Sequence, residues 1–340
     1  MKCIYNSTLV ELKEELVRNG FKPYSAKQIF NWIYKRRVKD FSAMTTIAKN
    51  QREELENIFY FPELPILKKE ESKDGTKKFL FQLTDQETIE SVLIPKKERN
   101  TLCLSTQVGC KFNCKFCASN IGGFVRNLEV SEIINQYLEL SKRCNITNIV
   151  FMGIGEPLDN LKNVYKAIKI LTEPLGINFT KKRITVSTCG LPNKIKELAD
   201  LNLGIKLSLS LHAADDGKRT KIMPINKKYP LDQLVEALGY YQKKQKYPVT
   251  FEYIMINNFN LEESDVKKLA KLVNKIGAKL NLIPYNPTGT DLKSADLVER
   301  ENFKQKLKEK NIIFTTRKSR GEDINAACGQ LRSLNLKKGS

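Results

Sequence analysis

From residue 101 onward, short apolar runs alternate with longer stretches of helical periodicity, and this alternation constrains the fold most strongly. The apolar runs are 102–107, 149–153, 183–187, 205–211, 250–255, 279–284 and 312–316. The helical stretches between them are 131–141, 161–171, 193–200, 231–243, 262–276 and 299–310. Such alternation is typical of parallel β/α architecture. Because six or seven units are too few for a closed eightfold barrel, the pattern predicts an α/β fold with a partial (β/α)6 barrel over residues 101–316.

The first hundred residues have different periodicities. Residues 1–60 are predicted to form a small helical accessory domain, because apolar residues recur at helical spacing near the start and again in 25–37 and 48–58. Residues 61–100 contain two short apolar or β-branched runs, 77–83 and 88–94, which predict a β-hairpin linker. Glu90 lies inside the second run. A solvated carboxylate and a functional carboxylate are equally compatible with that position.

Residues suited to ligand binding follow several predicted strands. In parallel β/α folds the site lies at the carboxyl ends of the strands. After the second strand, Gly153 and Gly155 allow the backbone to approach a ligand, and Glu156 supplies a carboxylate. Later strand ends carry Ser187, Ser210, His212 and Asn286. Each signal is weak alone, since a lone histidine is usually structural, but their shared location predicts a ligand pocket.

Three cysteines with the spacing C-x3-C-x2-C follow the first predicted strand of the barrel: Cys110, Cys114 and Cys117. Structural zinc usually has four ligands in two closely spaced pairs. Three cysteines alone suit an iron–sulfur cluster better, and the missing fourth thiolate leaves one iron open to another ligand. Buried hydrophobic cysteines are the alternative. The polar residues between them, such as Lys111 and Lys115, argue against it.

The chain is strongly basic, with 58 Lys and Arg residues against 38 Asp and Glu residues and a net charge of +20. Such an excess favours a polyanion as partner, RNA or DNA above all. A lysine-rich surface that is merely solvated would give the same total. Because basic doublets occur along the whole chain, we expect a broad basic face and no disordered arm.

Hydropathy and cysteine content bound the cellular setting. Residues 1–15 carry charges throughout and lack an apolar core, and no apolar run reaches the length of a membrane span. We therefore expect a cytoplasmic protein without a membrane partner. Eight cysteines in an intracellular chain of 340 residues favour metal or redox chemistry over a disulfide scaffold.

The C-terminal segment 317–340 contains Cys328 among small residues after the last predicted strand. Basic residues such as Arg317 and Arg320 precede it and would lower the pKa of a thiol that they approach. An incidental cysteine and a reactive cysteine are both compatible with this segment.

Several motifs together cover nearly the whole chain. They are 28–34, Gln107-Val108-Gly109-Cys110, the three-cysteine motif, Phe124-x-Arg126-Asn127-Leu128, Met152-Gly153-x-Gly155-Glu156-Pro157-Leu158-x-Asn160, Ser210-Leu211-His212, Met223-Pro224-Ile225-Asn226 and Asp323-Ile324-x-Ala326-Ala327-Cys328-Gly329-Gln330-Leu331. The three-cysteine motif with Gly155-Glu156-Pro157 resembles the radical S-adenosylmethionine (radical SAM) superfamily. The full set resembles the RNA methyltransferases that modify adenine at carbon 2, the RlmN type.

The resemblance implies two cofactors and their ligands. Cys110, Cys114 and Cys117 would hold a [4Fe-4S] cluster whose open iron binds the amino and carboxylate groups of S-adenosylmethionine. The residues implied around that cofactor are Gly155, Glu156, Ser187, Ser210, Leu211, His212 and Asn286.

The resemblance also implies catalytic roles for three residues. Cys328 would accept a methyl group and become S-methylcysteine, Cys103 would later form a disulfide with it, and Glu90 would accept the ring proton. The remaining cysteines, Cys3, Cys144 and Cys189, match no functional position and are predicted to be structural.

The implied reaction consumes two S-adenosylmethionine molecules per turnover, because carbon 2 of adenine is too electron-poor to attack a sulfonium methyl directly. One molecule methylates the Cys328 thiolate. The second yields a 5′-deoxyadenosyl radical that activates this methyl group for addition to the ring. The implied partners are 23S rRNA at the peptidyl transferase centre, tRNA, and an electron donor such as flavodoxin or ferredoxin, and we expect a monomer.

Three rival functions remain at this point. Methylation of adenine at carbon 8, as in the antibiotic-resistance sister type, would use the same cysteines and Glu90, although that type tends to have Ala in place of Pro157. A non-catalytic basic RNA-binding protein with a zinc-filled cysteine loop is the second rival. The third is a radical enzyme that activates another protein, against which the basic excess and the cysteines Cys103 and Cys328 argue.

Overall fold

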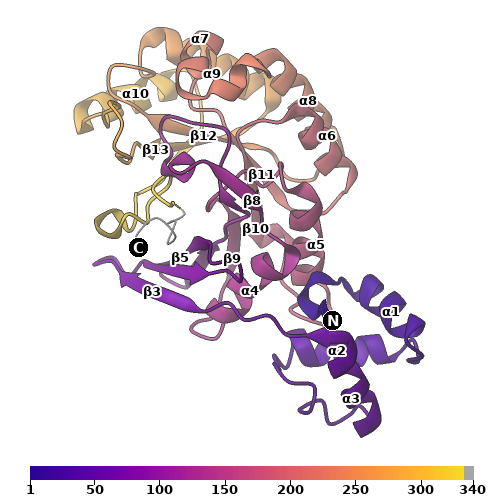
Figure 1. Cartoon of the computed structure of the whole chain (residues 1–340). Helices are drawn as coiled ribbons and strands as arrows, with labels where there is room; N and C mark the ends of the chain where they lie inside the picture. Colours follow the sequence, from indigo (N-terminus) through magenta and orange to yellow (C-terminus); the bar gives the residue numbers. More distant parts are fainter. Residues whose placement is uncertain (333–340) are drawn as a thin grey trace.

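A ten-stranded sheet forms the centre of the computed structural model, which describes residues 1–332 (Figure 1). The strand order is β14-β13-β12-β11-β10-β9-β6-β5-β4-β3. The parallel strands are β6 (Arg99–Cys103), β9 (Asn148–Phe151), β10 (Ile184–Thr188), β11 (Lys206–Ser210), β12 (Thr250–Met255), β13 (Lys279–Pro284) and β14 (Phe314–Thr316). The predicted parallel β/α architecture is confirmed.

Helices cover the outer face of the parallel strands (Figure 1). They are α4 (Val130–Leu140), α5 (Leu161–Thr172), α6 (Pro192–Asp200), α7 (Asp216–Ile222), α8 (Leu231–Lys244), α9 (Glu263–Ile276) and α10 (Leu297–Glu309). All except α7 follow the predicted stretches within a few residues. In α9, Val266, Leu269 and Val273 form the buried stripe, and the exposed face carries lysines. This amphipathic pattern is what the sequence periodicity reports.

The first predicted barrel strand, 102–107, is divided in two. β6 ends at Cys103, and β7 (Gln107–Gly109) pairs antiparallel with β8 (Phe124–Asn127) in a separate two-stranded sheet. Between them, the buried Ser105 hydroxyl donates a hydrogen bond to the Glu90 carbonyl at 2.6 Å, and Ser105 also accepts one from the Ile154 amide at 2.9 Å. These bonds hold Ser105 between β5 and the loop after β9, and the small sheet then frames the cysteine loop.

The predicted hairpin is present and extends the main sheet. β3 (Ile66–Glu71), β4 (Lys77–Gln82) and β5 (Thr88–Lys96) are antiparallel, and β5 also pairs antiparallel with β6. β3 was not predicted, because its sequence is rich in Lys and Glu and lacks strict alternation. Charged residues are common on an edge strand, where they discourage pairing with other chains.

The N-terminal helices α1 (Leu9–Arg18), α2 (Ser25–Tyr34) and α3 (Lys49–Ile58) lie to one side of the barrel (Figure 1). The short strands β1 (Lys2–Cys3) and β2 (Phe59–Tyr60) pair beside them. Trp32 is buried, and its indole N–H donates to the Thr46 hydroxyl at 2.8 Å, so it is a core residue. Within residues 1–332, no helix is both long and apolar enough to span a membrane.

Candidate functional site

A cavity opens at the carboxyl ends of the parallel strands. Ten of the thirteen predicted site residues line it: Cys110, Cys114, Cys117, Gly155, Glu156, Ser187, Ser210, His212, Asn286 and Cys328. The other three, Glu90, Cys103 and Leu211, are buried outside its lining. Residues from strand ends nearly 220 positions apart thus share one wall, as the carboxyl-end rule requires.

The cysteine loop is held by backbone hydrogen bonds at both ends. The Cys110 amide donates to the Gly123 carbonyl at 3.2 Å, and the Cys117 amide donates to the Cys114 carbonyl at 3.1 Å. Burial raises the pKa of the Cys110 thiol to about 12, and burial also raises the pKa of Cys114 and Cys117. The free thiols therefore keep their protons, and a bound metal must displace them.

The donor set of the cysteine loop suits a cluster better than a single ion. Among residues 1–332, no three His, Cys, Asp or Glu side chains are arranged to hold one metal ion. In a [4Fe-4S] cube each thiolate binds a different iron, so the ligands lie farther apart. The three thiols share the cavity wall with the apolar side chains of Phe112, Phe116 and Met223.

The loop after β9 fits closely against the start of the cysteine loop. Gly155 has φ +99°, and a Cβ atom there would lie 2.5 Å from the Gln107 Cβ, so only glycine fits. The Gln107 side-chain oxygen accepts a hydrogen bond from the Glu156 amide at 2.8 Å. The Glu156 carboxylate accepts bonds from the amides of Cys189 at 2.7 Å and Leu158 at 3.1 Å. Glu156 therefore joins the ends of β9 and β10.

His212, the only histidine, contributes a neutral ring to the cavity wall. Burial lowers its pKa to about 3, and Arg219 adds to the effect. The Ile254 amide donates to Nδ1 at 3.2 Å, so Nε2 carries the ring proton. Phe116 of the cysteine loop packs edge-on against the ring, with 4.5 Å between ring centroids. The ring is thus a fixed N–H donor and not a titrating base.

Arg219 on α7 was not predicted from the sequence. It is fully buried, and its guanidinium donates to the carbonyls of Cys189 at 2.6 Å, Ser210 at 3.1 Å and Leu211 at 3.2 Å. The side chain of Leu211 lies in the core, and its backbone carbonyl accepts the hydrogen bond from this arginine. Arg219 thereby holds the ends of β10 and β11 together. No sequence pattern distinguishes this arginine from surface ones on a short helix.

The segment carrying Cys328 packs directly on the cysteine loop. Gly329 has φ +84°, a Cβ atom there would lie 2.7 Å from the Phe116 carbonyl oxygen, and its own carbonyl accepts a bond from the Ala118 amide at 2.6 Å. The Asn286 side chain donates to the Cys328 carbonyl at 3.1 Å. These contacts bring Cys328 beside Cys110–Cys117 across two hundred residues of sequence.

Cys103 lies behind Cys328 in an apolar cluster with Val92, Ile154, Ala326 and Leu331. Burial raises the pKa of Cys103 to about 12; the neighbouring Cys328 raises it further, and Arg317 lowers it. Arg317 also lines the cavity, and Cys328 is the main cause of its raised pKa. All eight cysteines are free. Arg317 thus places a positive charge near two thiols, a role that the sequence suggested only through its basic residues.

The three other cysteines occupy different environments. Cys3 is buried in the N-terminal helical region, and Cys144 is half-buried after α4. Cys189 lines the cavity, where its amide holds Glu156. The cavity position of Cys189 is one that sequence analysis did not anticipate.

Glu90 on β5 faces the C-terminal segment from behind the cavity wall. Its carboxylate accepts a hydrogen bond from the Arg332 amide at 3.0 Å and lies 3.2 Å from the Lys78 ammonium. Burial raises its pKa, while the Arg332 amide and Lys78 oppose the shift. A raised pKa makes a carboxylate a better proton acceptor than a solvated one.

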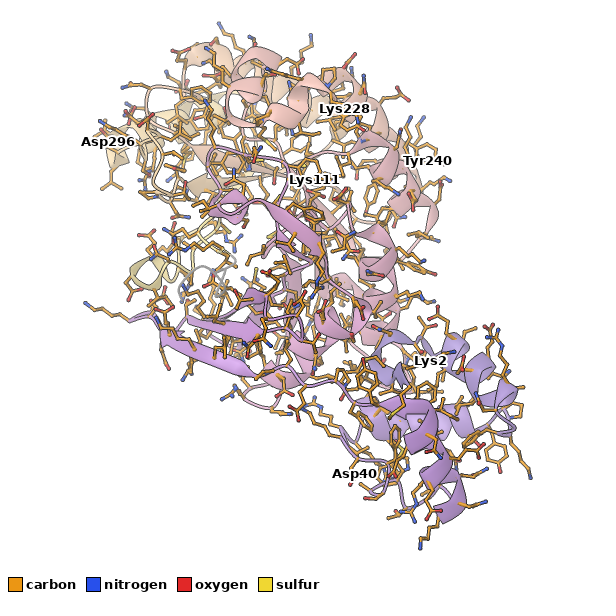
Figure 2. The ribbon with its side chains drawn as sticks, viewed as in Figure 1. Lys2, Asp40, Lys111, Lys228, Tyr240 and Asp296 are labelled. Carbon is orange, nitrogen blue, oxygen red and sulfur yellow. The ribbon has the colours of Figure 1, made fainter. Side chains whose placement is uncertain are left out.

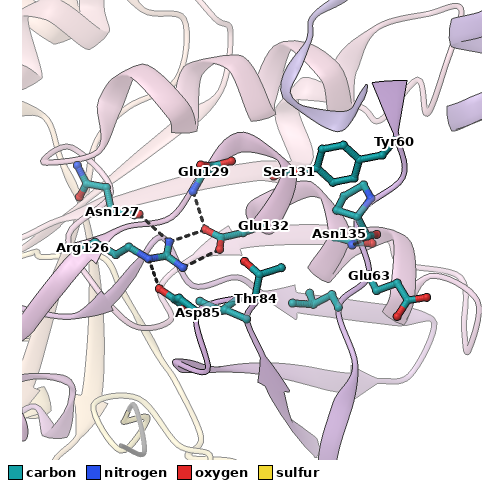
Figure 3. A pocket seen from close by; sticks show the side chains of 13 residues that line it. Tyr60, Glu63, Thr84, Asp85, Arg126, Asn127, Glu129, Ser131, Glu132 and Asn135 are labelled. Atoms are coloured by element: carbon teal, nitrogen blue, oxygen red, sulfur yellow. Dashed lines mark hydrogen bonds and ion pairs between the residues drawn. The ribbon is translucent and has the colours of Figure 1, made fainter. Parts of the chain in front are cut away.

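Arg126 clamps three elements around the site (Figure 3). Its Nε donates to the Asp85 carboxylate at 2.7 Å, and its two terminal nitrogens donate to Glu132 at 2.8 Å each. Asp85 lies in the hairpin turn, Arg126 on β8 and Glu132 on α4. The clamp therefore holds the strand that frames the cysteine loop against the hairpin that carries Glu90.

Lys111, within the cysteine loop, lies near the middle of the molecule in Figure 2. Its ammonium is 2.8 Å from the Asp159 carboxylate and lies above the rings of Phe112 and Phe124. About half of its side chain is exposed. It joins the cysteine loop to the turn that follows Glu156.

Comparison with known proteins defines the class. Residues 104–272 match the radical SAM superfamily, and residues 4–61 match the ribosomal RNA large subunit methyltransferase N-terminal domain. The crystal structure of a radical SAM methyltransferase from Sphaerobacter thermophilus is 38% identical in sequence and superposes with a TM-score of 0.91, covering 97% of this chain and 99% of that one. The fold is therefore that of a radical SAM protein with a partial barrel, as predicted.

Similarity to curated proteins narrows the family. The dual-specificity RNA methyltransferase RlmN of a Nitratiruptor species is 44% identical, covering 98% of each chain. The protein of that name from Campylobacter fetus subsp. fetus is 43% identical, covering 95% of this chain and 97% of its own. The chain belongs to the RlmN family of radical SAM RNA methyltransferases. This family implies a [4Fe-4S] cluster and S-adenosylmethionine.

Proposed function

We propose that this protein methylates carbon 2 of an adenosine in 23S rRNA, at the peptidyl transferase centre, and of an adenosine in tRNA. The observation that carries the proposal is the contact of Gly329 with Phe116 and Ala118, which seats Cys328 on the cysteine loop. A thiol at that position can accept a methyl group and present it within the same cavity. The relatives named dual-specificity RNA methyltransferase RlmN support RNA as the substrate.

The two cofactors would occupy the cavity at the strand ends. Cys110, Cys114 and Cys117 would hold the [4Fe-4S] cluster. The residues proposed around S-adenosylmethionine are Gly155, Glu156, Ser187, Ser210, Leu211, His212 and Asn286. When bound and reduced, the cluster and S-adenosylmethionine supply a 5′-deoxyadenosyl radical, so one molecule is the radical source and a second is the methyl donor.

The residues of the chain divide the remaining work. The Cys328 thiolate accepts the methyl group by displacement, and Arg317 lines the same cavity. Glu90 accepts the proton lost from the ring carbon. Cys103 then attacks the Cys328 sulfur: the sulfur–carbon bond breaks, its electron pair leaves with the carbon, which takes up a proton, and a disulfide forms. The one unpaired electron of the ring adduct would go to a one-electron acceptor, a role that the oxidised cluster could supply. Cys328 influences the pKa values of both Cys103 and Arg317, which indicates that the three are neighbours and supports the attack of one thiol on the other.

The wider setting follows from the same proposal. We assign residues 1–60 to an RNA-binding accessory domain, 61–100 to the hairpin, 101–316 to the barrel and 317–340 to the methyl-accepting segment, of which 333–340 lie outside the described residues. The reactive adenine must be splayed out of its stack to reach the cavity. We infer a cytoplasmic monomer that receives electrons from a flavodoxin or a ferredoxin.

The test is nucleoside mass spectrometry of RNA from cells with and without the gene. We expect 2-methyladenosine in rRNA and tRNA only when the gene is present, and we expect Cys328→Ala to abolish it. Cys144→Ala, which changes a half-buried cysteine after α4, should leave the product unchanged. Formation of 8-methyladenosine would assign the sister activity. If the RNA contained neither methylated nucleoside, the proposal would be wrong.

A further inference from the structure

The amino-terminal ends of the parallel strands, opposite the cavity, carry a group of exposed cations that we term the strand-start face. Its members are Lys96, Lys97, Arg99, Lys182, Arg183, Lys206 and Lys279. Within residues 1–332 none of these side chains takes part in an ion pair or a side-chain hydrogen bond. On the outer helices, by contrast, lysines such as Lys196 and Lys244 pair with carboxylates.

Two observations show that these cations lie close together. One hollow is lined by Lys96, Lys97, Glu98, Arg99, Thr147, Asn148 and Arg183, with a single carboxylate among four cations. The pKa of Lys206 is lowered first by burial and then by the charges of Lys279, Arg99 and Lys182. Arg99 belongs to both groups, so the face is continuous.

The sheet register sets the spacing of the face. Asn148 lies opposite Thr101, and Lys206 lies opposite Thr185, while Lys279 lies opposite Thr250. Neighbouring strands are roughly 5 Å apart, so the five steps from β6 to β13 extend over about 25 Å. A row of cations at this scale matches the repeating charge of a nucleic acid backbone.

The chemistry of the hollow favours phosphates over a protein partner. Its lining contains no apolar or aromatic side chain, whereas the centre of a protein interface needs such residues. Crowded cations without counter-charges destabilise one another, and phosphate oxygens relieve that repulsion while accepting hydrogen bonds from Lys, Arg, Thr and Asn.

We propose that the strand-start face binds backbone phosphates of the RNA substrate, away from the modified base. This inference rests on the proposed action on RNA. The parallel strands are about five residues long, so the face lies roughly 15–20 Å from the strand ends where the base enters. Only an RNA that folds around the edge of the barrel contacts both regions, so the face selects large, structured substrates.

The test compares two triple variants of the holoenzyme with equal charge changes. Lys96→Gln/Lys97→Gln/Arg183→Gln removes three cations of the face, and Lys267→Gln/Lys271→Gln/Lys275→Gln removes three exposed cations from α9. Affinity for a long 23S rRNA transcript is measured at several salt concentrations. Each phosphate contact contributes about 0.7 to 0.9 to the slope of log K against log salt, so the first variant should lose about 2 in slope and bind at least ~10-fold more weakly.

The control variant should keep the slope and affinity of the wild type, and Lys96→Arg/Lys97→Arg should keep both as well. An unchanged slope in the first variant would overturn the inference, even if methylation proceeds normally. Unchanged RNA binding with slower reduction by flavodoxin would overturn it too, since the face would then bind an acidic protein. Failure of the proposed function is distinguishable, because the wild type would then form no methyladenosine.

Discussion

Arg317 is the residue that connects the two thiols to the chemistry. It lines the cavity, its charge opposes the rise in the pKa of Cys103, and Cys328 is the largest influence on its own pKa. A buried thiol is otherwise a poor nucleophile, because burial favours the protonated form. The Arg317 guanidinium, which cannot lose its proton, offsets part of this cost for Cys103.

Replacing Cys103 by Ala should trap RNA on the enzyme. Without a thiol to attack the Cys328 sulfur, the bond between that sulfur and the methylated base has no route to break. Denaturing gels of reactions with labelled RNA should show a covalent complex that is absent for Cys103→Ala/Cys328→Ala. Normal turnover by Cys103→Ala would exclude the resolving role.

For single residues, sequence patterns predicted which side chains line the cavity but not which buried side chains hold the strand ends in place. Strand-end residues such as Ser187, Ser210 and His212 were predictable because parallel strands place their carboxyl ends at one edge. Arg219 was not predictable, since the residue type alone does not tell whether an arginine is buried against carbonyls or exposed on the surface. The partnership of Cys103 and Cys328 came from family resemblance, because no periodicity connects residues that far apart.

The C-terminal segment forms hydrogen bonds with elements from distant parts of the chain. Arg320 donates to the Pro95 carbonyl at 3.1 Å, Asp323 accepts from the Ser72 hydroxyl at 2.6 Å, and Ser119 donates to the Leu331 carbonyl at 2.8 Å. The segment thus joins the hairpin to the cysteine loop, and Figure 1 shows it between β5 and β13. The hairpin therefore contributes to the site by holding the segment that carries Cys328.

Loss of the Arg126 clamp should weaken the junction of the hairpin, β8 and α4. Arg126→Ala removes charge-assisted hydrogen bonds to Asp85 and Glu132, so we expect the free energy of unfolding to fall by about 2 kcal/mol. Chemical denaturation measures this change. Arg18→Ala is the matched control, because its 3.9 Å pair with Glu15 is exposed and should contribute under about 0.5 kcal/mol. Equal effects of the two changes would contradict the clamp.

Periodicity predicted the long elements because each buries one face. It failed at β3, where an edge strand has no strict alternation, and at α7, whose seven residues are too few to show a helical period. The first barrel strand also ends earlier than predicted, next to Ser105, whose side-chain hydrogen bonds no sequence pattern reports.

The whole molecule has two functional faces at opposite ends of the same strands. One end gathers the cysteine loop, the Glu156 loop and Cys328 around a cavity. The other end carries the unpaired cations of the strand-start face. The net charge of +20 had suggested a polyanionic partner without locating it. The strand-start face gives that partner a proposed location, because its cations gather around one hollow without ion pairs among the described residues.

The central claim is that Cys328 carries the methyl group before the RNA does. Protein isolated after exposure to S-adenosylmethionine with a deuterated methyl group should contain one labelled methyl on the peptide that includes Cys328, as measured by mass spectrometry. RNA added next, with unlabelled S-adenosylmethionine and a reductant, should receive that label in 2-methyladenosine. If Cys328 stays unmodified while the enzyme still forms 2-methyladenosine, the two-stage route is wrong.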